Sequence, residues 1–158
     1  MGFLSRLFPL FSQEVELVAC ALLLHVKRPY GKKTAVIEIM NTQTFAELDR
    51  TIRQIMDYDG WDHCSAFFQG TPWESNCIAE VYPDNSGPGQ NKKIGSLFLE
   101  PGQSLGYVYD LGDNISHIIS VKGFSPPDPQ KLYPIASLNI APKRSRKNTN
   151  SSRRTRDS

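Results

Sequence analysis

Two histidines of this chain lie close in sequence to carboxylates, and these residue types could do chemistry together. Asp62 adjoins His63, and Asp110 and Asp113 precede His117 by seven and four residues. Imidazole and carboxylate groups suit Zn, Mn or Fe, so His63, Asp110, Asp113 and His117 form a candidate divalent-metal set. Such a site needs its ligands on one face and an open coordination position. One hypothesis is therefore a metal-dependent, hydrolase-like enzyme.

The same residues also fit a tight turn that requires no chemistry. The segment Tyr107–His117 reads YVYDLGDNISH and has Gly112 at its centre. Glycine permits a left-handed backbone, and Asp or Asn beside it can hydrogen-bond its own backbone. Apolar residues on both sides fit two strands joined as a hairpin. From the residues alone the turn is the favoured interpretation, and no catalytic residue is assigned.

Other signatures of chemistry are missing from the sequence. It contains no P-loop, no G-x-G-x-x-G before a helix and no G-x-S-x-G elbow. The cysteines Cys20, Cys64 and Cys77 form no C-x-x-C pair, which favours a reducing compartment over a disulfide scaffold. We therefore expect no cofactor beyond such a metal ion, and a cytoplasmic protein, or a nuclear one in a eukaryotic host.

The elements that must position these residues begin with a predicted hairpin and helix. Val15–Val26 and Thr34–Met40 are rich in β-branched and alternating apolar residues, which predicts two strands. Thr44 and Glu47 then form a T-x-x-E capping box, the mark of a helix start. Apolar residues recur at helical spacing from Phe45 onward, so an amphipathic helix follows.

The rest of the chain reads mostly as short extended segments. We predict strands at Trp61–Gln69, Cys77–Pro83, Leu105–Asp110, Ile115–Lys122 and Tyr133–Ile140, with Ile94–Leu99 ambiguous between a strand and a helical turn. Strands adjacent in sequence favour an antiparallel sheet covered by the helix, which is a single α+β domain. That domain spans 13–140, between an N-terminal extension, 1–12, and a disordered tail, 141–158.

Charge is distributed unevenly along the chain. The formal net charge is +2, but the last 18 residues hold seven basic groups and one acidic group. The basic groups are Lys143, Arg144, Arg146, Lys147, Arg153, Arg154 and Arg156. This tail predicts a nuclear-targeting signal, a salt-sensitive and non-specific arm for nucleic acid, or a solubilising extension. The apolar run near the N-terminus is about 12 residues long, too short for a transmembrane segment.

Several of these segments together resemble the Ri-plasmid ORF-three-like family, which is also labelled transposon passenger TnpR. The resemblance covers roughly 15–125 and rests on the family's hallmark Y-x-Y-D-F-G-D-x-W-x-H-x-I. The matching residues are Tyr107, Tyr109, Asp110, Gly112, Asp113, His117 and Ile119. Leu111 and Ile115 replace the Phe and the Trp, and His63 with Phe67 fits the H-x-F element only loosely. The resemblance implies an antiparallel α+β fold and a link to mobile elements.

The TnpR label does not carry over to a serine resolvase. That chemistry needs a nucleophilic serine among arginines in the core, and the arginines here lie mostly in the tail. Our leading prediction is a non-enzymatic interaction module with a protein or small-molecule partner. The alternatives are the metal-dependent enzyme and a DNA-binding accessory that uses the tail.

Overall fold

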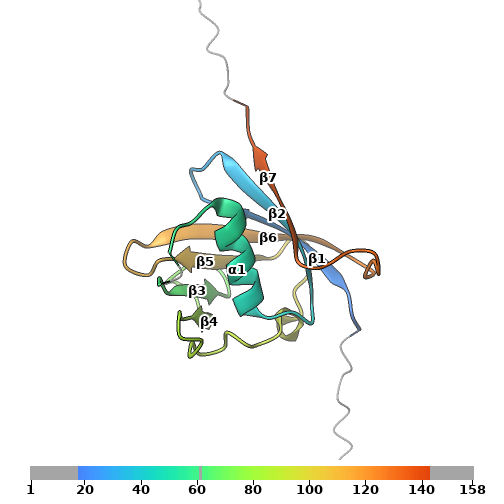
Figure 1. Cartoon of the computed structure of the whole chain (residues 1–158), viewed down its shortest axis with the longest axis horizontal. Helices are drawn as coiled ribbons and strands as arrows, with labels where there is room; N and C mark the ends of the chain where they lie inside the picture. The colour runs from blue at the N-terminus through green and yellow to red at the C-terminus, as the bar shows by residue number, and fades with distance from the viewer. Residues whose placement is uncertain (1–17, 61, 143–158) are drawn as a thin grey trace, which may run out of the picture.

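The computed structural model describes residues 18–60 and 62–142. Within these ranges the chain forms one seven-stranded antiparallel sheet with a helix across one face (Figure 1). The elements are β1 (Ala21–Lys27), β2 (Lys33–Met40), α1 (Phe45–Met56), β3 (Ser65–Phe68), β4 (Cys77–Val81), the 3-10 turn η1 (Ile94–Leu97), β5 (Ser104–Tyr109), β6 (Ile115–Ser125) and β7 (Ile135–Ile140). The strand order is β4-β3-β5-β6-β1-β2-β7. The antiparallel α+β prediction is confirmed.

The hairpin and the helix form as their sequence patterns predict. β1 and β2 pair from Ala21↔Met40 to Lys27↔Thr34, and alternate residues of both strands are buried. At the start of α1, Thr44 accepts from the Glu47 backbone N–H while the Glu47 carboxylate accepts from the Thr44 backbone N–H. The capping box therefore satisfies backbone donors that the first turn leaves free.

Four predicted strands, which correspond to β1, β3, β4 and β7, are shorter in the structure. β3 begins at Ser65 rather than at Trp61, because the carbonyls of Gly60 and His63 accept from the Arg53 side chain instead of joining a strand ladder. β1 begins at Ala21, and the earlier part of the predicted strand lies partly outside the described residues. The ambiguous segment near Ile94 is a 3-10 turn.

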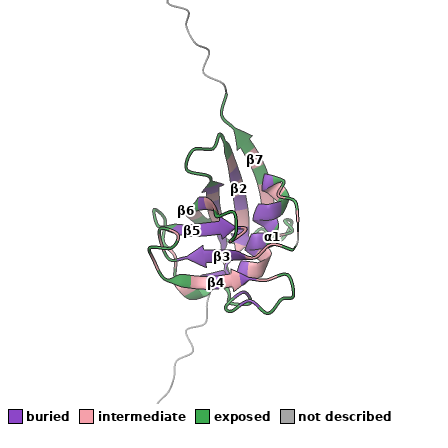
Figure 2. Cartoon of the chain, turned by 90° about the vertical axis from the view of Figure 1, so that its left-hand side faces the viewer, coloured by how far each residue is buried: buried purple, intermediate pink, exposed green. Residues whose placement is uncertain are grey.

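The main core lies between the sheet and α1. Phe45, Leu48 and Ile52 of the helix are fully buried against it, and β3 and β5 are buried along most of their length (Figure 2). A small second cluster of Ala66, Phe68 and Val108 lies on the other face of the sheet. No helix within the described residues covers that face. None of the described helical segments is long and apolar enough to cross a membrane.

Candidate functional site

The first hallmark tyrosine fastens β5 to the helix. Tyr107 is fully buried on the helix side of the sheet, and its hydroxyl donates to Oδ1 of Asp49 at 2.7 Å. The Ser65 hydroxyl donates to the same oxygen. Burial and the neighbouring Asp49 carboxylate raise the pKa of Tyr107 well above its ordinary value. Tyr107 therefore stays protonated and serves as a hydrogen-bond donor.

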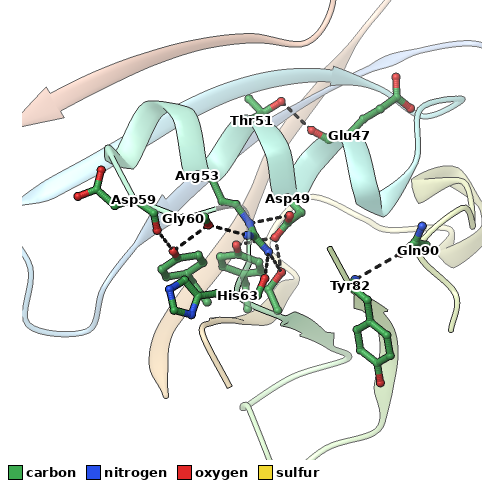
Figure 3. A network of polar contacts seen from close by, with 12 residues as sticks. Glu47, Asp49, Thr51, Arg53, Asp59, Gly60, His63, Tyr82 and Gln90 are labelled. Atoms are coloured by element: carbon green, nitrogen blue, oxygen red, sulfur yellow. Dashed lines mark hydrogen bonds and ion pairs between the residues drawn. The ribbon is translucent and has the colours of Figure 1, made fainter. Parts of the chain in front are cut away.

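Arg53 extends this network to the segment that follows the helix. Its Nε lies 2.8 Å from Oδ2 of Asp49, one helical turn earlier, and both side chains are only 4% exposed. Figure 3 shows the guanidinium between Asp49 and the carbonyls of Gly60 and His63, to which it donates at 3.3 and 2.8 Å. Although burial lowers the pKa of Arg53, the paired Asp49 raises it above its usual value. The ion pair is therefore charged, although the Nε of Arg53 makes no well-aligned hydrogen bond within the described residues.

The second hallmark tyrosine and the following aspartate secure the same segment from the β5 side. The Tyr109 hydroxyl donates to the carbonyls of Asp59 and Gly60. Asp110 has a left-handed backbone with φ of 55°, and its Oδ1 accepts from the backbone N–H groups of Gly112 and Asp113 at 3.0 and 3.2 Å. Side-chain bonding of this kind is how Asp holds a turn.

The turn itself corrects one detail of the sequence interpretation. A left-handed backbone was predicted at Gly112, but the residues with positive φ are Asp110 at 55° and Asn114 at 54°. The loop closes with the Asn114 N–H donating to the Asp110 carbonyl at 2.7 Å. Asp and Asn tolerate this conformation better than most residues, so the turn depends on them and not on the glycine.

The hallmark histidine is buried among aromatic rings. His117 faces Tyr107 in the β5–β6 register and is 0% exposed. Its Nε2 lies 2.5 Å from the Tyr58 hydroxyl, and the Tyr58 ring stacks on Tyr109 with centroids 4.6 Å apart. Burial, with a smaller contribution from the Arg28 charge, lowers the pKa of His117 to about 4. The imidazole is therefore neutral at physiological pH.

The predicted metal set is brought together only in part. Nδ1 of His63 lies 3.0 Å from Oδ2 of Asp110, and His63 is 40% exposed. His117 instead contacts Tyr58, and the Asp113 side chain is exposed in the turn. Over 18–60 and 62–142, no three His, Cys, Asp or Glu side chains are placed to hold a metal ion. All seven basic residues predicted for nucleic acid lie outside the described residues.

Sequence reasoning missed three partners of the hallmark. Asp49 and Arg53 lie four residues apart on the buried face of α1, beside the apolar positions Leu48 and Ile52. A charged pair inside an apolar helix stripe was therefore the available signal, since such charges are rarely buried unless they are paired. Nothing comparable marked Tyr58 as the partner of His117.

A groove lies on the opposite face of the sheet, over β6. Its volume is about 460 Å³, and we call it the sheet-face groove. It is lined by Pro29, Gly70, Thr71, Pro72, Ser104, Leu105, Ser116, Ile118 and the hallmark residue His117. Gly106 makes one wall possible, because a Cβ there would lie only 2.4 Å from the Gly70 carbonyl and 2.7 Å from the Pro72 ring. The backbone of the β3–β4 connection can therefore cross β5 closely and border the groove.

Three basic residues lie near this groove, although none of them lines it. Lys27 pairs with Ile118 in the β1–β6 register, and Arg28 follows it into the turn of the hairpin. Lys122 lies on the same face of β6 as Ile118, and all three basic residues are exposed. The nearest described acid on this face of β2, Glu38, is paired with Lys131 at 2.8 Å. The neighbourhood of the groove thus carries three exposed basic residues and one exposed acid, Glu74 of the β3–β4 connection.

The fold and the contacts of the hallmark residues define a class of protein. Its members have an antiparallel sheet with one helix, and Tyr, Asp and His residues beside the β5–β6 turn hold these elements together. The model of the plasmid pRiA4b ORF-3-like protein family matches residues 34–143, which is more than half of the chain. The chain therefore belongs to that family, and the resemblance drawn from the hallmark is confirmed.

A solved structure supports the fold. The crystal structure of MM3350, a protein of unknown function from Methanosarcina mazei Go1, matches with 21% sequence identity and a TM-score of 0.56. The match covers 75% of this chain and 67% of MM3350. At this identity the likeness establishes the fold alone. No curated protein matches the chain.

Proposed function

We propose that the chain is a non-enzymatic interaction module whose sheet-face groove binds an extended, acidic segment of a partner protein. The observation that carries this proposal is the groove itself, an apolar channel with basic side chains near it on the sheet face that α1 leaves open. Apolar surface contributes affinity, while complementary charge contributes specificity and association rate.

The hallmark supports this proposal because its side chains serve internal contacts. Tyr107, Tyr109 and His117 are hydrogen-bonded to Asp49, to the carbonyls of Asp59 and Gly60, and to Tyr58. Catalytic groups need a position from which they reach a substrate. Buried groups bonded to neighbouring elements instead make the surrounding surface rigid, and a rigid surface loses less entropy on binding.

The groove chemistry indicates the kind of segment that fits. Pro29, Pro72 and Ile118 offer contacts to apolar side chains, and the hydroxyls of Ser104 and Ser116 can bond a peptide backbone. Arg28 stands at the Pro29 end, where a second hollow of about 480 Å³ continues past Tyr30. An extended peptide that alternates apolar and acidic residues matches both features.

The proposal is tested by binding of synthetic peptides. Peptides of about ten residues that alternate Glu with Leu or Pro would be compared by fluorescence anisotropy with peptides in which Lys replaces each Glu. We expect the acidic set to bind, and Arg28→Glu to weaken that binding about tenfold or more. Lys92→Glu reverses an equal charge in the loop before η1 and should have little effect. Equal binding of both peptide sets, or equal losses in both variants, would refute the proposal.

The two alternatives have direct tests of their own. Inductively coupled plasma mass spectrometry of the purified protein measures bound metal, and a stoichiometric metal lost in His63→Ala would establish the metal-dependent alternative. Truncation after Pro142 removes the basic residues of the tail. A salt-dependent affinity for duplex DNA that disappears on this truncation would establish the nucleic-acid arm.

A further inference from the structure

The strand β7 is an unprotected edge of the sheet. Over the described residues it pairs with β2 alone, so its other side offers unpaired backbone groups. Its sequence, IASLNI, has no charge and no proline, and its pairing with β2 has no bulge. Proteins usually guard such edges with charges, prolines or bulges, because an exposed edge is a template for another strand.

The pairing with β2 shows which backbone groups are free. The Ala141 N–H donates to the Lys32 carbonyl at 3.1 Å, so this pair is of the hydrogen-bonded kind. Pairs alternate in kind along an antiparallel ladder. The backbone N–H and C=O groups of Ala136, Leu138 and Ile140 therefore point away from β2, toward the open edge. Pro134 and Pro142 share this parity and have no N–H to offer.

We propose that two copies of this chain associate by antiparallel pairing of their β7 strands, about a two-fold axis at Leu138. In this register Leu138 faces the partner's Leu138, and Ala136 faces the partner's Ile140. Pro134 and Pro142 lie four residues before and after Leu138. Pro134 therefore lies opposite the partner's Pro142, just outside the hydrogen-bonded pairs. Moving the centre one residue either way, which shifts the register by two residues, would place a proline opposite Ile140 or Ala136 and lose hydrogen bonds.

The side chains agree with a second copy as the occupant. Ala136 and Leu138 are on the helix side of the sheet, where both pack against the core, and Ile140 has the same parity. Ser137 and Asn139 are exposed on the other face of the sheet. In this register Ser137 faces the partner's Asn139, and Asn139 faces the partner's Ser137. Apolar residues thus oppose apolar residues and polar oppose polar. That is the self-complementarity that a two-fold interface requires.

A groove beside the edge provides a place for the exposed isoleucine. Ile140 is 64% exposed, which is unusual for an isoleucine in a strand. Between α1 and β7 lies a hollow of about 490 Å³ that is lined in part by Arg50, Ile55 and Ala136. Because the partner's Ile140 lies opposite Ala136, its side chain reaches this hollow. Figure 2 shows β7 at the edge of the sheet, with exposed residues along it.

The test is sedimentation equilibrium of the full chain and of point variants. Wild type should be a concentration-dependent dimer. Ile140→Lys, at an exposed position, should weaken the dimer about tenfold or more because it replaces the apolar contact with a charge that must lose water at the interface. Leu132→Lys adds the same charge at a residue that is 91% exposed outside β7 and should leave the dimer unchanged. Circular dichroism melting confirms that each variant is folded.

Three outcomes would overturn the dimer: a wild-type monomer at high micromolar concentration, an unchanged dimer in Ile140→Lys, or an equal loss in Leu132→Lys. The result is independent of the function proposed above. β7 and the sheet-face groove share no residue, so a monomeric Ile140→Lys variant should keep its affinity for acidic peptides.

Discussion

The Tyr107 hydroxyl donates to Asp49 Oδ1 at 2.7 Å, joining β5 to α1 across 58 positions of the chain. With Ser65 and Arg53 it forms a network on one carboxylate that is almost completely buried. Buried polar groups are costly when they lose a partner, so such a network favours the one arrangement in which its bonds form. The family hallmark therefore sets the position of the helix on the sheet.

Removing this hydroxyl should destabilise the fold. Tyr107→Phe leaves the ring in place but deprives a buried carboxylate of a donor, so we expect a loss of about 1–3 kcal/mol in the free energy of unfolding. Urea denaturation measures it. Tyr30→Phe removes a hydroxyl from a fully exposed side chain and should cost almost nothing. Equal stability of the two variants would contradict the role given to Tyr107.

The buried ion pair should be far more sensitive to single than to double replacement. Asp49→Leu leaves the Arg53 charge without its partner, and we expect a loss of about 3–5 kcal/mol. Adding Arg53→Met removes that stranded charge, so the double variant should be more stable than Asp49→Leu alone. A double-mutant cycle in urea checks this order. Additive losses would show that the two side chains act independently.

His117 should make stability depend on pH. Its folded pKa of about 4 is below its ordinary value of 6.5, so the unfolded chain binds more protons between these values. The stabilisation is complete above pH 6.5 and is lost as pH falls toward 4. A shift of this size corresponds to about 3 kcal/mol.

Replacement of the ring tests this pH dependence. His117→Gln should be less stable at pH 7 and should show a smaller slope of unfolding free energy between pH 6.5 and 4. The ring contacts the hydroxyl of Tyr58 and the ring of Tyr107, and the charge of Arg28 acts on it without a direct contact. His25→Gln, on the open sheet face, is the control and should keep most of the slope. An unchanged slope in His117→Gln would exclude His117 as its source.

The turn should tolerate a change at its glycine better than at its aspartate. A Cβ on Gly112 would meet only Asp110 Oδ1, at 3.3 Å, and φ there is not left-handed. Gly112→Ala should therefore cost less than about 1 kcal/mol. Asp110→Ala loses two turn bonds and places alanine at φ of 55°, so we expect about 1–3 kcal/mol. Thermal melts of both variants test this order, and the reverse order would refute it.

Local patterns predicted much of the fold. Alternation located β1 with β2, and the Thr44–Glu47 box located the start of α1, because these signals act between near neighbours. The strand order could not be predicted in the same way. β1 lies between β2 and β6, and β7 returns to pair with β2, so both arrangements depend on contacts between residues far apart in the chain.

The candidate site shows the same limit. The hallmark identified Tyr107, Tyr109, Asp110 and His117 as a set, and the structure places them all around one corner. Their partners Asp49 and Tyr58 come from another part of the chain, which residue types alone do not reveal. The sheet-face groove was also absent from the sequence interpretation, because it is lined by β5, β6 and two connections that only the folded sheet brings together.

The location of the binding surface tests the central claim most directly. Chemical shifts of the isotopically labelled protein would be followed by NMR as an acidic and apolar peptide of about ten residues is added. We predict that the largest changes fall on Ser104, Ser116 and Ile118 and that they disappear in Arg28→Glu. Changes concentrated instead on His63 and Asp110, and unaffected by Arg28→Glu, would contradict the claim and place the functional site at the hallmark corner.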